Sequence, residues 1–292
     1  TYSYSSSTVS NNYSMSFDGS RYVNVGNDTS FNIDNSPNMQ KTIMFWAKYV
    51  DLPGSGNNYG AVMVNVTPTC LGSSSCYDLL IWFQDQGNPG IIISTGSSVD
   101  PCAHELIPLS INYSNWHHYT ITLEATGPNS GVKTLWLDGI NIYSCNYISN
   151  APDSLNSDLI FGAHVLNGNN MTGVDYLDDV SFWNRVLSQQ EIQQYSTCPP
   201  IGTESGLLGY WNFEEGSGTT TSDQTSNGND GSLINGVNWS TNVPNIACYS
   251  TYDYTWSTGD TTTSITVSPT ATTTYSVTVD DGISSCTDSV TV

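Results

Sequence analysis

Residues 115–138 read NWHHYTITLEATGPNSGVKTLWLD, and this stretch decides the fold. On either side of the polar segment 126–131, aromatic and β-branched residues recur at every second position. Such period-two runs, split by Gly, Pro and Asn, are typical of an antiparallel β-hairpin. Asp138-Gly139 then predicts the next tight turn. The centre of the chain is therefore predicted to be β-sheet.

Four further segments of interest lie before and after this hairpin, two on each side. They are MSFDGSRYVNVGN at 15–27, KTIMFWAKYV at 41–50, DLIFGAH at 158–164 and GVDYLDDVSFWNRVLSQQEIQQY at 173–195. With the Trp-His pair and the Asp-Gly turn, they resemble the laminin-G-like, concanavalin-A-like jelly-roll family. The resemblance covers about residues 15–195 and implies an antiparallel sandwich that ends in a short helix. It does not assign a function, because a fold of this kind hosts many.

The helix is predicted from about Ser188 to Tyr195. Ser188 is a suitable N-cap, and Glu191 stands at the third helical position. This spacing is that of a capping box.

Residues 196–248 form a different piece, which begins with the stiff sequence Cys198-Pro199-Pro200. The run that follows resembles the N-terminal segment of a laminin-G-like domain, the part that normally precedes the opening strand. It either packs back on the jelly roll or forms a separate hairpin between domains. Exposed large aromatic residues would form a costly patch. Trp211, Phe213 and Trp239 therefore favour packing back.

Residues 249–292 alternate strongly and contain a second hairpin signal, Asp281-Gly282. They resemble the Ig-like or PKD-like repeats of secreted adhesins from gliding bacteria. Residues 1–14 are predicted to be an edge segment or linker. Because both ends are Ser/Thr-rich and β-like, we expect an excerpt of a longer chain. The predicted fold class is all-β, an antiparallel jelly-roll sandwich (15–195) plus a small C-terminal Ig-like β-sandwich (249–292).

The composition limits the partners. The net charge is −21, from 5 Lys and Arg against 26 Asp and Glu. Such a surface argues against nucleic acid and anionic membranes as partners and is compatible with divalent cations. No run of eighteen apolar residues predicts a membrane span. Seven cysteines predict an oxidising, extracellular compartment.

The cysteines suggest a set of disulfides without fixing their connectivity. Our preferred pairs are Cys70 with Cys76, Cys102 with Cys145, and Cys198 with Cys248. Cys286 is then free or paired outside the chain. The alternative joins Cys248 to Cys286.

Catalytic motifs are missing from the sequence. Jelly-roll glycosidases use paired carboxylates that flank one bond. Glu214 and Glu215 are adjacent and would face opposite ways on a strand. His117 and His118 are predicted to be structural, one pointing inward and one outward. We therefore expect no enzyme.

Calcium is the cofactor that the acidic residues favour, because hard cations take carboxylate, Asn and backbone oxygens. In related jelly rolls the opening and closing strands lie side by side and sometimes hold a structural calcium. The resemblance thus implies a first site of Asp18, Asp178 and Asp179. A second candidate is the loop DQTSNGND, with Asp223, Asn227 and Asp230. For both sites the alternative is ordinary turn chemistry.

The function that we expect is adhesion at the cell surface, through binding of glycans or surfaces by one module of a long multidomain protein or filament. Long polar loops and the aromatic residues in or beside them could serve recognition, namely Tyr59, Tyr77, Trp82 and Tyr113. No single residue is predicted as a glycan site. One alternative is a structural spacer or filament subunit with no ligand of its own, whose partners would be neighbouring copies of the chain. The other is an ancillary domain of a secreted glycoside hydrolase.

Overall fold

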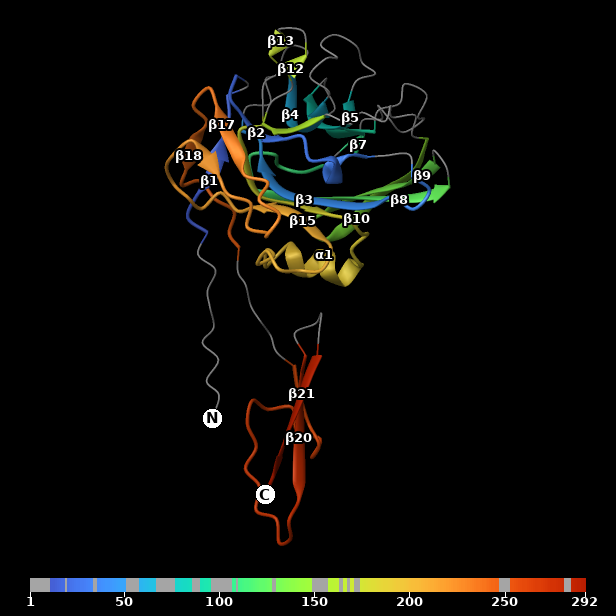
Figure 1. Cartoon of the computed structure of the whole chain (residues 1–292), viewed down its shortest axis with the longest axis vertical. Helices are drawn as coiled ribbons and strands as arrows, with labels where there is room; N and C mark the ends of the chain where they lie inside the picture. The colour runs from blue at the N-terminus through green and yellow to red at the C-terminus, as the bar shows by residue number, and fades with distance from the viewer. Residues whose placement is uncertain are drawn as a thin grey trace.

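The structure is a computed structural model. It describes residues 11–18, 20–33, 36–50, 58–66, 77–85, 90–95, 107–108, 110–127, 130–148, 157–162, 165–166, 169–170, 174–246, 253–280 and 285–292. Their regular secondary structure is almost all β-strand, and two large sheets pack face to face (Figure 1). The predicted all-β jelly roll is confirmed.

The first large sheet, called sheet A, has the order β10-β9-β8-β3-β14-β1-β18, and β15 also pairs with β14. Its strands are β1 (Ser14–Ser16), β3 (Gln40–Lys48), β8 (His117–Gly127), β9 (Ser130–Leu137), β10 (Ile140–Ile148), β14 (Tyr176–Trp183), β15 (Leu207–Trp211) and β18 (Asn238–Ser240).

The second large sheet, called sheet B, has the order β16-β17-β2-β11-β4-β5-β6-β7. Its strands are β2 (Tyr22–Gly26), β4 (Asn58–Val66), β5 (Tyr77–Asp85), β6 (Gly90–Ser94), β7 (Ile107–Pro108), β11 (Asp158–Phe161), β16 (Thr220–Thr221) and β17 (Gly231–Ile234). A 3-10 helix, η1 (Thr29–Phe31), follows β2, and a small ribbon joins β12 (Val165–Leu166) to β13 (Asn169–Asn170).

The hairpin predicted at 115–138 is β8–β9, which lies in sheet A between the edge strand β10 and β3. Its core-facing side chains, such as Tyr119 and Ile121, lie in the main hydrophobic core between the two sheets. Asp138 and Gly139 have φ values of 49° and 75°. Positive φ at both central residues is the type I′ conformation that suits a tight hairpin. The predicted turn is confirmed.

A second, smaller core lies between the outer face of sheet A and α1 (Gln189–Tyr195). Figure 1 shows α1 on the side of sheet A that faces away from sheet B. Trp183 and Ile192 meet there, and both are fully buried. The Ser188 hydroxyl accepts from the Glu191 amide, and the Glu191 carboxylate accepts from the Ser188 amide, at 3.3 and 2.8 Å. The predicted capping box is therefore present. Within the described residues, no helix has both the length and the apolar character needed to cross a bilayer.

The segment after α1 belongs to the sandwich. β15 pairs with β14 and β18 pairs with β1 in sheet A, and β17 pairs with β2 in sheet B. Trp211 and Phe213 are fully buried in the main core. The segment thus packs back on the jelly roll of its own chain, as the burial of its aromatic residues requires.

The segment 15–27 resembles the single opening strand of laminin-G-like domains, but here it is divided between two strands. It forms β1 in sheet A and β2 in sheet B, so the chain crosses from one sheet to the other near Asp18. Met15 and Val23 both point into the core between the sheets. A pattern of apolar residues predicts which side chains are buried, but it does not predict that the chain passes from one sheet to the other.

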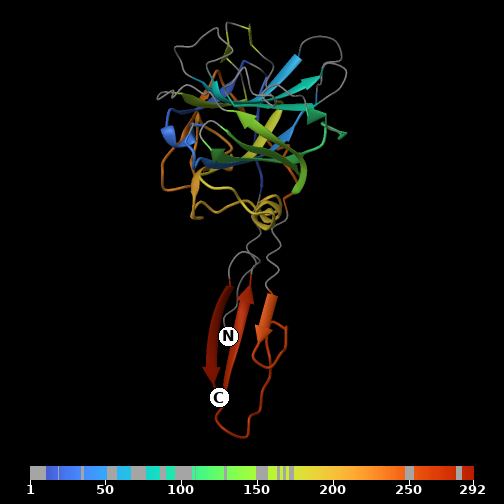
Figure 2. The same ribbon diagram turned by 90° about the vertical axis from the view of Figure 1, so that its right-hand side faces the viewer.

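The C-terminal residues form a separate three-stranded sheet of β19 (Asp253–Trp256), β20 (Thr274–Asp280) and β21 (Ser285–Thr291), which is seen edge-on in Figure 1 and face-on in Figure 2. The prediction was a small two-sheet sandwich. The described residues of this region supply one sheet, whose side chains are half-buried or exposed.

The cysteines are described only in part. Cys286 is exposed and free, which disagrees with a Cys248–Cys286 pair. Cys145 and Cys198 are disulfide-bonded. Their partners lie outside the described residues, as do Cys70, Cys76, Cys102 and Cys248, so the three preferred pairings stay predictions.

Candidate functional site

The first candidate centre is a pair of adjacent carboxylates on β14. The pairing of β14 with β3 is irregular between Asp178 and Ser181, and Asp179 has a φ of 47°. Both carboxylates are buried at this irregularity. Asp178 is 0% exposed and Asp179 is 7% exposed. The Tyr210 hydroxyl donates to Asp179 Oδ1 at 2.5 Å, and Asn11 Nδ2 donates to Asp178 Oδ2 at 3.1 Å.

The surroundings disfavour negative charge on these two groups. Burial and the neighbouring Asp179 carboxylate raise the pKa of Asp178 well above its usual range. Burial also raises the pKa of Asp179 to about 7, and the charge of Glu214 adds to the effect. A bound cation would supply the missing positive charge.

Asp18 does not join this pair, which corrects the predicted three-residue set. Ser16 lies opposite Tyr176 in the β1–β14 register, and the Phe17 amide bonds to the Asp175 carbonyl. Asp18 therefore lies about four positions from Asp178 along β14, or roughly 13 Å at the usual strand rise. Its carboxylate instead pairs with Arg21 at 2.9 Å.

The residues beside Asp178 partly fit calcium. Among the described residues, no group of three or more His, Cys, Asp or Glu side chains is arranged to hold a metal ion. Calcium also takes Asn and backbone oxygens. Asn11 Oδ1 is buried, beside Asp178, and has no hydrogen-bond partner in the described part of the chain. Asp178, Asp179 and Asn11 would hold the ion, whose role would be structural. Calcium stays a prediction.

We expect calcium to raise the thermal midpoint by about 5–10 °C at a concentration about a hundredfold above its dissociation constant. The shift should disappear in the double variant Asp178→Asn, Asp179→Asn and persist in Asp18→Asn, the matched control. Scanning calorimetry with calcium and then with EDTA measures both. An equal shift in the double variant and the wild type would contradict this site.

The second predicted calcium loop is held together by hydrogen bonds within the protein. Asp223 Oδ1 accepts from the amides of Tyr210 and Thr225, at 3.1 and 2.9 Å. Its Oδ2 accepts from the Thr225 hydroxyl at 2.9 Å and from the Asn229 amide at 3.0 Å. Four donors leave this carboxylate little capacity for a metal ion.

The other two residues predicted for this loop also serve its structure. Asp230 Oδ1 accepts from the Asp223 amide at 2.9 Å, and Asn227 Nδ2 donates to the Leu208 carbonyl at 2.9 Å. The structure brings these residues together, but as the turn chemistry that was the alternative.

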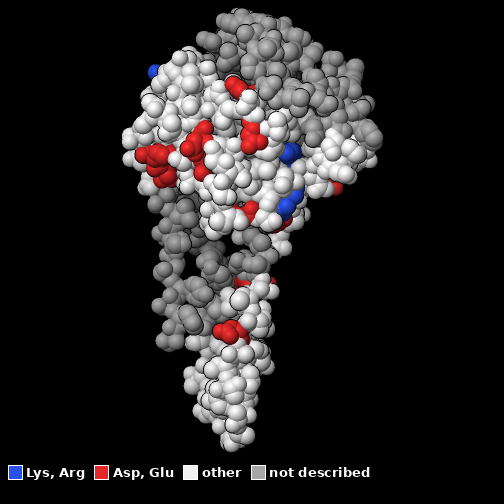
Figure 3. Space-filling model, viewed as in Figure 1, with Lys and Arg blue, Asp and Glu red and all other residues white. Residues whose placement is uncertain are grey.

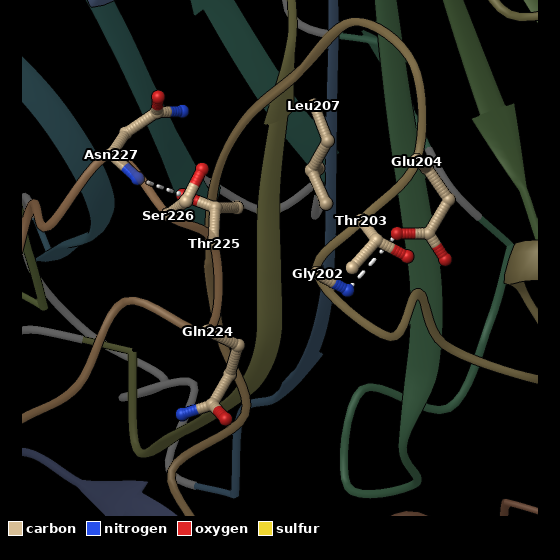
Figure 4. A pocket seen from close by; sticks show the side chains of 8 residues that line it. All are labelled: Gly202, Thr203, Glu204, Leu207, Gln224, Thr225, Ser226 and Asn227. Atoms are coloured by element: carbon tan, nitrogen blue, oxygen red, sulfur yellow. Dashed lines mark hydrogen bonds between the residues drawn. The ribbon is translucent and has the colours of Figure 1, made fainter.

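This loop forms one wall of a pocket with a volume of about 540 Å³. Figure 4 shows the described residues that line it, Gly202, Thr203, Glu204, Leu207, Gln224, Thr225, Ser226 and Asn227. Ligand pockets of about 300–1,000 Å³ are common, and most are lined by apolar side chains. This one is lined mainly by hydroxyl, amide and carboxylate groups, with Leu207 as its one large apolar residue among those described.

The opposite wall is the turn 201–207, which precedes β15. Glu204 Oε1 accepts from the Ile201 amide at 2.7 Å, and Glu204 Oε2 accepts from the Gly202 amide at 3.0 Å. The Leu207 amide bonds back to the Glu204 carbonyl at 3.2 Å. Both walls are thus set by hydrogen bonds within the protein.

Sequence analysis named Asn227 as a site residue and missed the other described lining residues, Thr203, Glu204 and Ser226 among them. These are common surface residue types in two loops about twenty positions apart. Their proximity follows from the pairing of β15 with β14 and from the Gln224 amide, which bonds to the Tyr210 carbonyl at 2.8 Å. No local pattern in the sequence signals that contact.

Two of the aromatic residues suggested for glycan stacking are buried. Tyr113 is 5% exposed and packs against Phe83, with ring centroids 5.9 Å apart. Trp82 is 7% exposed and lies in a cluster on the outer face of sheet B. Neither offers an open ring face. The side chains of Tyr59 and Tyr77 lie outside the described part of the structure.

The two adjacent glutamates act separately, as expected. Glu214 Oε1 accepts from the Asn12 and Tyr13 amides, at 2.8 and 3.0 Å, and so holds the segment that leads into β1. Glu215 Oε1 accepts from the Ser222 amide at 2.7 Å. The two carboxylates therefore face different segments and do not flank a common cleft.

Both histidines have the structural roles that we predicted. His118 is 2% exposed and its ring meets that of Trp46 edge-on, with centroids 5.3 Å apart. His117 is half-buried, and its Nδ1 lies 2.8 Å from Asp138 Oδ2. This hydrogen bond raises the pKa of His117.

Residues 17–193, more than half of the chain, match the concanavalin A-like lectin/glucanases superfamily. The chain belongs to this superfamily. The laminin-G-like resemblance of the sequence is thereby confirmed, and the pocket lies beyond the matched residues of the superfamily.

Solved structures share the superfamily fold with the chain. A candidate carbohydrate-binding protein from Bacteroides ovatus is 14% identical with a TM-score of 0.54, over 81% of this chain and 61% of the other. A heptameric SAP-like pentraxin from Limulus polyphemus is 13% identical with a TM-score of 0.52, over 82% and 98%. The chain thus spans less than two thirds of the Bacteroides protein. Among proteins with curated functions, none matches the sequence.

Proposed function

We propose that the chain is a non-catalytic, extracellular module that binds glycans and serves adhesion within a longer surface protein. The observation that carries the proposal is the pocket between residues 202–207 and 224–227. Its hydroxyl, amide and carboxylate groups are the groups that bind sugar hydroxyls. It lies on a fold whose superfamily includes lectins.

The described carboxylates support a binding role over a catalytic one. Glycoside hydrolysis requires two carboxyl groups on either side of the scissile bond. Glu204 is the one carboxylate among the described residues that line the pocket. Asp178 and Asp179 are buried, so neither can flank a bound sugar.

The extracellular setting rests on composition and covalent chemistry. Cys145 and Cys198 are disulfide-bonded, and disulfides persist in oxidising compartments. The surface is acidic, with Asp and Glu spread over the face drawn in Figure 3. We further propose that the C-terminal sheet is part of an Ig-like or PKD-like repeat, as in adhesins with tandem modules.

The test is a glycan array probed with the full chain, followed by titration of each hit in solution. The urea-unfolded chain is the control. We expect saturable binding to at least one class of glycan and no new reducing ends after prolonged incubation. Absence of binding would favour the structural spacer. Release of reducing ends that is lost in Glu204→Gln would favour a hydrolase.

A further inference from the structure

The pocket carries one fixed acidic group. Both oxygens of Glu204 accept backbone N–H groups, from Ile201 at 2.7 Å and Gly202 at 3.0 Å. Each oxygen keeps further acceptor capacity. None of the described lining residues is Lys, Arg or His. The local charge is therefore negative and has no counter-ion from the lining residues.

The turn 201–207, which carries Glu204, is held close to the opposite loop. Gly202 has a φ of 96°, and a Cβ atom added there would lie 2.2 Å from the Gln224 carbonyl oxygen. The two loops thus touch through their backbones beside the pocket. The Ser205 carbonyl also accepts from Arg185 Nε at 3.0 Å. A ligand that enters meets a carboxylate in a set position.

Other lining groups are available to a ligand. The side-chain hydroxyls of Thr203 and Ser226 make no hydrogen bond within the described part of the chain, and both residues are exposed. In Figure 4, Thr203 lies with Glu204 on one side, and Ser226 lies with Thr225 on the other. Groups on both sides can thus bind hydroxyls of one sugar.

We propose that this pocket binds an uncharged or positively charged sugar unit and rejects acidic sugars, with Glu204 as the residue that sets the selection. The inference rests on the proposed function. Sugar hydroxyls and a protonated sugar amine donate to a carboxylate, whereas a sugar carboxylate or sulfate is repelled by it. We expect the repulsion between Glu204 and an acidic sugar group in contact with it, exposed to water, to lower affinity on the order of tenfold.

The experiment compares the full-length wild type with Glu204→Gln, Ser226→Ala and Asp253→Asn. Asp253→Asn is the matched control, because it removes one exposed carboxylate from the separate C-terminal sheet. The probes are three sets of glycans with the same backbone: neutral, with a free amine, and with a carboxylate. Titration calorimetry at low and at high salt gives the affinities.

The wild type should bind the neutral and amino sugars and bind the acidic ones about tenfold more weakly or not at all. Glu204→Gln should remove most of that difference, and Ser226→Ala should weaken binding of every set that the wild type binds. If the wild type binds glycans but both pocket variants behave like Asp253→Asn, the pocket inference is wrong and the proposed function stands. If the wild type binds no glycan, both are wrong.

Discussion

Replacing Trp211 by alanine is expected to lower the free energy of unfolding by about 3–5 kcal/mol. Trp211 lies on β15, in the segment after α1, and is 0% exposed. Its ring contacts Phe161 at a centroid distance of 5.1 Å and Phe31 at 5.8 Å. Its removal would leave a cavity in the middle of the main core.

The lost hydrogen bond adds to the cost. Trp211 Nε1 donates to the Asn229 carbonyl at 2.8 Å, and so holds the loop that forms one wall of the pocket. Without the indole, this carbonyl loses its partner in a half-buried place. Trp211→Ala should therefore also weaken any ligand that the pocket binds.

Trp256→Ala on β19 is the matched control. Trp256 also donates its Nε1–H to a backbone carbonyl, that of Thr262 at 2.7 Å, but it is only half-buried. We expect a cost of about 1 kcal/mol or less. Urea unfolding followed by circular dichroism measures both variants. Equal costs for the two variants would mean that the segment after α1 is not part of the main core.

Strong local patterns in the sequence predicted the local structure correctly. The alternation around Tyr119 and Ile121 specifies the β8 strand, because each of these side chains must face the core. Asp138-Gly139 specifies the turn, because few residue pairs accept positive φ twice. The capping box of Ser188 and Glu191 is equally local, since both of its hydrogen bonds lie within one helical turn.

Features that depend on contacts between distant segments were harder to predict. The break between β1 and β2 leaves the apolar pattern unchanged, because both strands face the same core. Asp179 has a positive φ that nothing in its neighbouring sequence requires. Asn11 lies beside Asp178 only because the chain that leads into β1 runs along β14.

Lowering the pH from 7.5 to 5 is expected to cost the fold about 2 kcal/mol through His118 alone. His118 is almost fully buried, and this burial lowers its pKa to about 3, against an ordinary value of 6.5. Between these two values the unfolded chain binds a proton that the folded chain does not. Stability therefore falls as the pH falls below 6.5 and levels off near 3.

The titration of His117 and of Asp138 also makes stability depend on pH. The hydrogen bond to Asp138 raises the pKa of His117, so its contribution is present below pH 6.5 and is lost as the pH rises. Burial opposes the ionisation of Asp138, but hydrogen bonds from His117 and from the His118 amide hold its pKa below the usual range. Its contribution is lost only in stronger acid. Neither His117 nor Asp138 therefore causes a loss of stability like that of His118 when the pH falls from 7.5 to 5.

The comparison of His118→Gln with His117→Gln isolates the effect. Glutamine remains polar but does not titrate, so the gap in unfolding free energy between the wild type and His118→Gln should shrink by about 2 kcal/mol between pH 7.5 and pH 5. For His117→Gln the gap should grow slightly or stay constant, because protonated His117 stabilises the wild type. Urea unfolding at each pH provides the values. A gap for His118→Gln that does not change with pH would mean that His118 is hydrated or protonated in the folded protein, against its burial beside Trp46.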